Sequence, residues 1–145
     1  MKVTDMAINT QFSIAVHMMA VLAHLKDRDI TSSNLATSVN TSPSFVRRVL
    51  AKLSRAGLVE TAMGKAGACW LARGAKSITL LDIYRAVDAP KVFSIHAYAE
   101  HRACLVSCNI KGALEKALRK SQEAMEVRLS ETSLAEITSD MSKSG

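Results

Sequence analysis

The sequence predicts a mostly helical protein with a small β wing and a long C-terminal helix. Hydrophobic residues make up 48% of the 145 residues but aromatic residues only 4%, so aliphatic side chains that favour helices build the core. Apolar residues recur with helical spacing in several segments, and a Gly-rich stretch separates two short runs of strand-forming residues. Folding a chain of this size hides about 68–70% of its unfolded surface, so the core needs no disulfides.

The first helix is expected to run from about Asn9, a favourable N-cap residue, to Lys26. Its apolar residues form two stripes, one beginning at Phe12 and the other at Ile14. A helix with two apolar stripes is buried on most sides. We therefore expect it to contact both its own domain and a second subunit.

The next segment predicts two helices joined by a tight turn. Ser32 or Ser33 caps a short first helix, and Ser42 caps the second with Pro43 at its first position, where a missing N–H costs little. Gly57 ends the second helix. Apolar residues of this helix follow the i, i+3, i+4, i+7 pattern, and basic residues occupy the opposite face. This arrangement is a helix-turn-helix with a basic outer face.

A short hairpin follows the second helix. Leu58–Met63 is expected to form one strand, Gly64–Gly67 the turn and Ala68–Ala72 the returning strand. A basic hairpin directly after a recognition helix is a wing, with Lys65 at its tip. We expect Trp70 to anchor the wing to the core, because it lies beyond the tip.

The C-terminal half contains three further helical signals. Thr79 with Asp82 three residues later marks the start of a short helix, whereas residues 88–103 break the helical pattern and predict a loop. From about Leu105 the helical period returns over more than twenty residues, longer than a small domain needs to bury, which indicates a dimerisation helix. Ser133 opens a short last helix.

The net charge of +6 is concentrated in one third of the chain. Residues 31–76 hold seven basic side chains and one acid, Glu60, a net of +6, whereas the remaining residues hold twelve of each sign. A cluster of one sign that coincides with a helix-turn-helix and a wing is typical of a surface that binds double-stranded DNA. A protein-interaction module without DNA binding is the distant alternative.

We expect three parts in one compact unit. Residues 1–88 form a winged helix-turn-helix DNA-binding domain, residues 89–104 a linker or sensor loop, and residues 105–145 the dimerisation helix with the short C-terminal helix. No apolar run approaches the roughly 20 residues that span a bilayer, so no membrane contact is expected. The start lacks the features of a signal peptide, and three cysteines suit free thiols in a reducing cytoplasm.

A recognition helix enters the major groove with its N-terminal residues nearest the bases. Ser42, Ser44 and Phe45 are therefore candidates for contacts with base edges, although Phe45 fits core packing equally well. Arg47 and Arg48 can reach either bases or phosphates. Phosphate contacts are expected from Lys52, Arg55, Arg73 and Lys76, and Lys65 can enter the minor groove.

Two cysteines lie near the start of the long helix. The partial positive charge of a helix N-terminus favours a thiolate at Cys104, so Cys104 is a candidate redox sensor with Cys108 as resolving thiol. Thiols that behave as small hydrophobic groups are the alternative, and we expect Cys69 in the wing to be structural. Zinc or an iron–sulfur cluster would need three or four ligands, with His96 and His101 the nearest additions to the cysteines.

Catalysis is not predicted. His101 and Cys104 lie three residues apart, but no Gly-rich phosphate loop, metal-binding motif or pair of carboxylates accompanies them. We expect no enzyme activity, no catalytic residue and no metal ligand.

Four segments together indicate a family: SVNTSPSFVRRVLAKLSRAGLVE, GKAGACWLA, ITLLDIYRAVD and a long helix that begins at Cys104. With them, residues 9–140 resemble the Rrf-two (BadM-type) family of bacterial winged helix-turn-helix regulators, and look closest to its YwnA-like branch. The resemblance implies a cytoplasmic homodimer, usually a repressor, that binds a pseudo-palindromic operator. Members with an iron–sulfur cluster carry three cysteines at wider spacing before the long helix, whereas this chain has Cys104 and Cys108.

Overall fold

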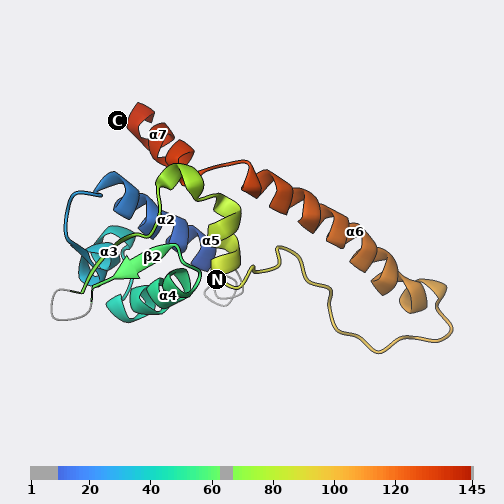
Figure 1. The fold of residues 1–145 in the computed structure, drawn as a ribbon. Coiled ribbons are helices and arrows are strands. Elements are labelled where there is room, and N and C mark those ends of the chain that lie inside the picture. Colours follow the sequence, from blue (N-terminus) through green and yellow to red (C-terminus); the bar gives the residue numbers. More distant parts are fainter. Residues whose placement is uncertain (1–9, 63–66, 145) are drawn as a thin grey trace. The chain divides into compact units, whose positions relative to one another are not determined.

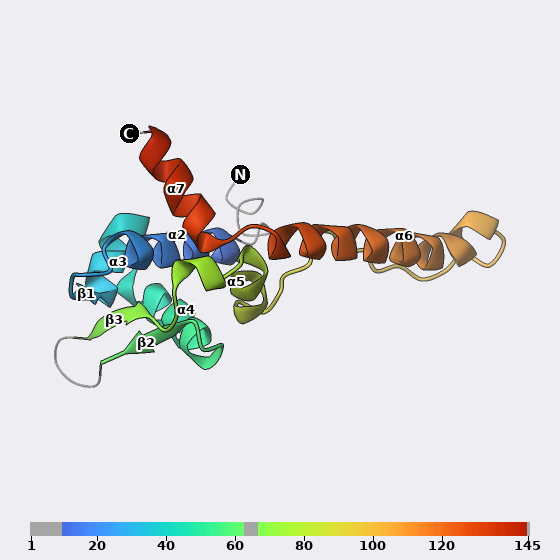
Figure 2. The ribbon, with the colours of Figure 1, turned by 45° about the horizontal axis from the view of Figure 1, so that its top comes forward.

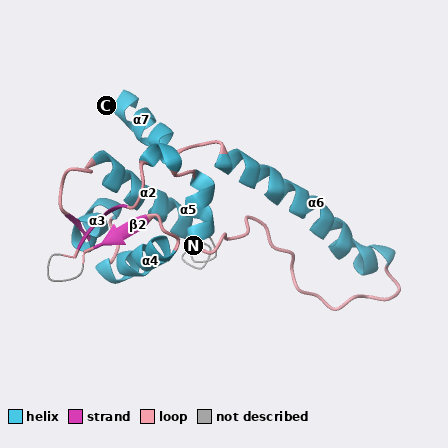
Figure 3. Cartoon of the chain, in the orientation of Figure 1, coloured by secondary structure: helices cyan, strands magenta, loops and turns pink. Residues whose placement is uncertain are grey.

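The computed structural model describes residues 10–62 and 67–144, which form six helices and a small sheet (Figures 1 and 3). The helices are α2 (Gln11–His24), α3 (Ser32–Val39), α4 (Pro43–Arg55), α5 (Leu80–Ala86), α6 (Leu105–Ser130) and α7 (Leu134–Ser144), with a 3₁₀ turn η1 (Ala75–Ser77). The strands are β1 (Ile30–Thr31), β2 (Val59–Thr61) and β3 (Ala68–Leu71). The predicted fold class, mostly helical with a small β wing and a long C-terminal helix, is confirmed.

The chain divides into two compact units. The first extends to Pro90 and resumes at Leu129, and the second spans Lys91–Arg128. These boundaries differ from those expected from the sequence because the last helix returns to the first unit, where α7 contacts α2 and Leu134 is fully buried. None of the described helices is long and apolar enough to cross a membrane.

Helices α3 and α4 form the predicted helix-turn-helix. Thr31, one residue before the predicted cap, caps α3 in a reciprocal capping box with Asn34. Ser42 caps α4 as predicted, since its Oγ accepts a hydrogen bond from the Phe45 N–H (3.2 Å), and Pro43 is the first helical residue. Gly57 follows α4 with a φ of 76°, a left-handed conformation that favours glycine.

The core of the first unit forms around α2. Its side chains Met18, Met19 and Leu22 are almost completely buried, which agrees with the prediction that this helix is covered on most sides. The predicted apolar face of α4 packs into the same core with the following residues: Val46, Val49, Leu50 and Leu53. The core therefore fixes the side of α4 that remains outside.

The wing is a three-stranded antiparallel sheet in the order β1-β3-β2 (Figure 2). Strand β1, which the sequence analysis did not predict, pairs with β3, and the hairpin tip 63–66 with Lys65 lies outside the described residues. The prediction that Trp70 anchors the wing to the core is wrong. Successive side chains of a strand point to opposite faces, so Cys69 is buried whereas Trp70 is 43% exposed and donates to Glu60 (3.3 Å).

Helix α5 is anchored at both ends. Thr79 and Asp82 form the predicted capping box at its start, and Thr79 also bridges Ser133 before α7. At its end, Asp88 and Ala89 both have positive φ angles (71° and 44°). The described segment 91–104 contains no helix or strand, as predicted, and leads to the 26-residue helix α6.

Candidate nucleic-acid interface

The outer face of α4 is the most basic surface of an element in the first unit. Arg47, Arg48 and Arg55 are all exposed on it, opposite the face that packs into the core. The Arg48 guanidinium lies over the Phe45 ring, 5.2 Å from its centroid. A cation over an aromatic face is attracted by the ring, which holds the Arg48 side chain near the N-terminal half of α4.

Two of the predicted base contacts also have structural roles. Phe45 is half-buried and packs against the core, and the Ser42 hydroxyl is engaged as the N-cap of α4. Ser44 is exposed on the first turn. The structure therefore places all three candidates at the N-terminus of α4, where Ser44 is the one whose side chain faces solvent without a printed role in the fold.

The predicted phosphate-binding residues fall into two groups. Arg55 and Lys76 are exposed, Lys76 on the 3₁₀ turn η1. In contrast, Lys52 forms an ion pair with Asp88 (Nζ–Oδ2 2.6 Å), and Arg73 forms one with Asp82 (Nη2–Oδ2 3.0 Å). The sequence analysis did not identify the two carboxylates, because their partners lie on other elements.

The two cysteines of the second unit occupy the start of α6. Cys104 directly precedes the helix, and its Sγ accepts a hydrogen bond from the Ser107 N–H (3.4 Å), as the oxygen of an N-cap side chain does. The Cys108 thiol donates to the carbonyl oxygen of His101 (3.6 Å). Both side chains are half-buried.

Cys69 is in a different environment. It is 2% exposed in β3, and its thiol donates to the carbonyl oxygen of Ile30 (3.3 Å). Burial raises the pKa of this thiol, which disfavours the reactive thiolate. Cys69 is therefore a structural residue of the wing.

The donor residues of one chain do not fit a metal centre or an iron–sulfur cluster. Such centres need three or four ligands, and Cys104 and Cys108 supply two. No group of three or more His, Cys, Asp or Glu side chains suited to a metal ion occurs in the described part of the chain. The His96 ring stacks on Tyr98 at a centroid distance of 4.9 Å.

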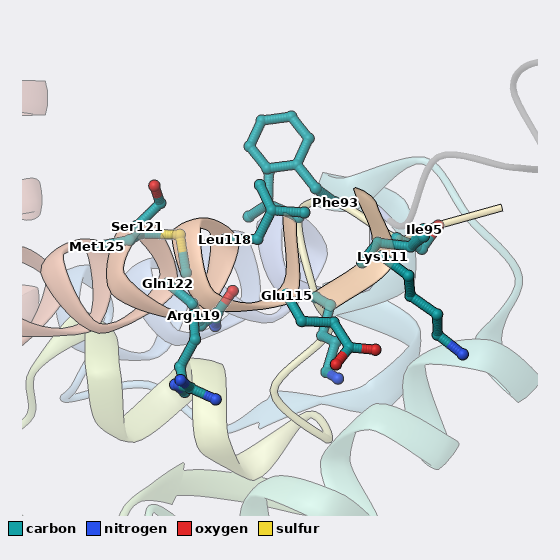
Figure 4. Close-up of a pocket in the computed structure, with 12 residues that line it drawn as sticks. Phe93, Ile95, Lys111, Glu115, Leu118, Arg119, Ser121, Gln122 and Met125 are labelled. Atoms are coloured by element: carbon teal, nitrogen blue, oxygen red, sulfur yellow. The ribbon is translucent and has the colours of Figure 1, made fainter. Parts of the chain in front are cut away.

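A groove of about 580 Å³ lies between the segment 91–95 and α6 in the second unit. Figure 4 shows the Phe93 ring above Leu118, with Met125 further along the same helix, and the charged side chains of Glu115 and Arg119 directed away from the Phe93 ring. Phe93 is 63% exposed. Other large hydrophobic side chains exposed in this unit are Val92, Leu105, Val106, Ile110 and Val127.

Comparison with known proteins identifies this arrangement. Residues 8–140 match the family described as Rrf2, iron-dependent transcriptional regulator. The chain is 32% identical over 131 residues to YwnA of Bacillus subtilis (strain 168), named as an HTH-type transcriptional regulator, and the match covers 90% of this chain and 96% of YwnA.

Solved structures are similar over nearly the same length. A crystal structure of a protein described as DNA-binding has 30% identity and a TM-score of 0.69, covering 88% of this chain and 97% of that one. CymR (YrzC), the global cysteine regulator of B. subtilis, has the same fold, with 23% identity, a TM-score of 0.66 and coverage of 91% and 95%. The chain therefore belongs to the Rrf2 family of DNA-binding transcriptional regulators, which are not enzymes.

Proposed function

We propose that this protein is a cytoplasmic homodimer that represses transcription by binding a pseudo-palindromic operator. The observation that carries the proposal is the outer face of α4, where Arg47, Arg48 and Arg55 are exposed while the opposite face is buried. A helix of this kind in a helix-turn-helix enters the major groove. The buried face fixes its orientation on the domain.

Within this proposal, the contacts divide by position on the helix. Ser44 and Arg48 lie in the N-terminal half of α4 and read base edges, and Arg47 reaches bases or phosphates. The remaining members of the proposed contact set are Ser42 and Phe45 at the base edges, Arg55 and Lys76 on phosphates, and Lys65 in the minor groove.

The dimer is proposed to form through the second unit. Phe93 and Leu118 present an apolar surface beside α6, and Leu105, Val106 and Ile110 continue the exposed apolar side chains towards the start of the helix. Large exposed apolar patches mark association surfaces. A second copy of α6 would bury them and place two reading heads about a two-fold axis.

In vitro selection from a randomised duplex library tests this function. We expect the purified protein to enrich a pseudo-palindrome whose half-site centres lie about 34–36 Å apart, one helical turn. Binding to the selected duplex should weaken with salt, with a slope of log K against log salt of about −0.9 for each phosphate contact. Enrichment of no sequence, or of a motif without symmetry, would contradict the proposal.

Oxidation of Cys104 is proposed to lower operator affinity. Peroxide would convert the Cys104 thiolate to a sulfenic acid with release of hydroxide, and condensation with the Cys108 thiol would form a disulfide and release water. The support is positional, because Cys104 caps α6 and the helix N-terminus favours the thiolate that reacts. Changing the cap sulfur would alter the start of the proposed dimer helix.

Cys104→Ser is therefore expected to remove the effect of peroxide on DNA binding while leaving the reduced protein unchanged. Serine is a preferred N-cap residue, so the variant keeps the hydrogen bond with the Ser107 N–H. The measurement is affinity for the selected duplex before and after peroxide. Cys69→Ser is the control that should respond like the wild type, and an undiminished response in Cys104→Ser would disprove the role of this thiol.

A further inference from the structure

Helix α5 carries one carboxylate near each end, and each is paired with a basic residue of a DNA-reading element. Asp82, in its first turn, pairs with Arg73, which lies two residues beyond wing strand β3 (3.0 Å). Asp88, just beyond its last turn, pairs with Lys52 of the recognition helix α4 (2.6 Å). The pairs connect α5 to the wing and to the recognition helix.

We propose that α5 sets the relative position of the recognition helix and the wing, with Asp82 and Asp88 as positioning residues. In this role Lys52 and Arg73 act through their carboxylate partners and do not contact phosphates. The inference rests on the proposed DNA interface, since it assumes that α4 and the wing both bind DNA.

The surroundings of Lys52 support a positioning role. Its ammonium group donates to two acceptors from different elements, the Asp88 carboxylate and the Gln11 side-chain oxygen at the start of α2 (2.8 Å). The Lys52 side chain is 26% exposed, in contrast to the exposed arginines on the same helix. A phosphate contact would require this group to leave both acceptors.

The turn at Asp88 is held by several contacts. Asp88 and Ala89 adopt the left-handed conformation that residues other than glycine rarely occupy, at an energetic cost that surrounding contacts must offset. Val87 is fully buried, and the Tyr84 hydroxyl donates to the carbonyl oxygen of Pro90. The Asp88 carboxylate is thereby directed at Lys52 from a defined backbone position.

Asp82 combines two roles at the other end of α5. One oxygen, Oδ2, accepts the Thr79 N–H (2.9 Å) within the capping box and also the Arg73 guanidinium (3.0 Å). The capping box fixes the carboxylate, because it bonds to the backbone of its own helix. Arg73 at the base of the wing is therefore attached to a rigid acceptor.

A double-mutant cycle on the Lys52–Asp88 pair tests the inference. Lys52→Met keeps the aliphatic stem, and Asp88→Gly removes the carboxylate at a position whose φ favours glycine. Each variant is expected to bind the selected duplex roughly 2- to 30-fold more weakly, the range for residues that act without touching the ligand. The double variant should be no weaker than the weaker single variant, because both changes remove the same interaction.

Salt dependence separates positioning from direct contact. Lys52→Met and Arg73→Met should leave the slope of log K against log salt unchanged, whereas Arg55→Met should reduce its magnitude by about 0.9. Lys143→Met, which breaks the Lys143–Asp140 ion pair within α7, is the matched control and should bind like the wild type. Thermal unfolding of every variant verifies that it is folded.

Three results would overturn the inference: losses that multiply in the double variant, a smaller salt slope in Lys52→Met, or tighter binding by Asp88→Gly. The last would mean that Asp88 withholds Lys52 from a phosphate. A wild-type protein that binds no selected duplex would refute the proposed function itself, so the two failures are distinguishable.

Discussion

Arg48→Ala is expected to remove operator binding while leaving the fold and the dimer nearly unchanged. A bidentate arginine contact with a base contributes about 1–3 kcal/mol, and the proposed dimer loses one at each half-site. Arg48 is exposed, and its contact with the Phe45 ring contributes only about 0.5–1 kcal/mol to stability. Mobility shift on the selected duplex measures the loss, and thermal unfolding measures the stability.

The matched control is Arg28→Ala, an exposed arginine in the turn after α2 and outside the proposed interface. It should bind the duplex like the wild type. A single-base change at the position read by Arg48 should matter to the wild type and not to Arg48→Ala. If Arg48→Ala binds normally, the recognition face has been misassigned.

Phe93→Asp is expected to give a monomer with much weaker operator binding. The ring is 63% exposed, so its removal costs the folded chain little, whereas a carboxylate would oppose burial of this surface in a dimer. Loss of bivalent engagement lowers apparent affinity by about 10²–10⁴-fold. Sedimentation velocity gives the oligomeric state, and titration of the selected duplex gives the affinity.

Two controls accompany this variant. Ala97→Asp places the same charge on an exposed residue of the same segment, outside the groove lining, and should remain a dimer. A duplex with a single half-site should be bound equally by monomeric Phe93→Asp and by one wild-type head. A dimeric Phe93→Asp would show that the dimer forms through another surface.

Much of the fold followed from local sequence signals. Ser42 with Pro43 predicted the start of α4, and Thr79 with Asp82 predicted the start of α5, because a capping residue and the amides it satisfies lie within one turn. The spacing of apolar residues gave the buried face of α4 correctly. It thereby also identified the outward face that carries the proposed DNA contacts.

Features that depend on distant residues were not predictable. Strand β1 has two residues, and its pairing with β3 joins positions 39 residues apart, Ile30 and Cys69. The environment of Lys52 depends on Asp88 and on Gln11, 36 and 41 residues away, so helical spacing alone assigned Lys52 to the same role as Arg55. Periodicity gives the face of a residue but not its partner.

The position of α5 along the chain has a consequence for signalling. The backbone leaves the first unit after Pro90 and returns to it at Leu129, and there are no other covalent links between the units. The outgoing link follows the end of α5, and the returning link reaches its start, where the Leu80 N–H donates to Thr132 (2.9 Å). Force carried by the backbone from a sensor in the second unit would thus act on both ends of one short helix before it reaches the surface that reads DNA.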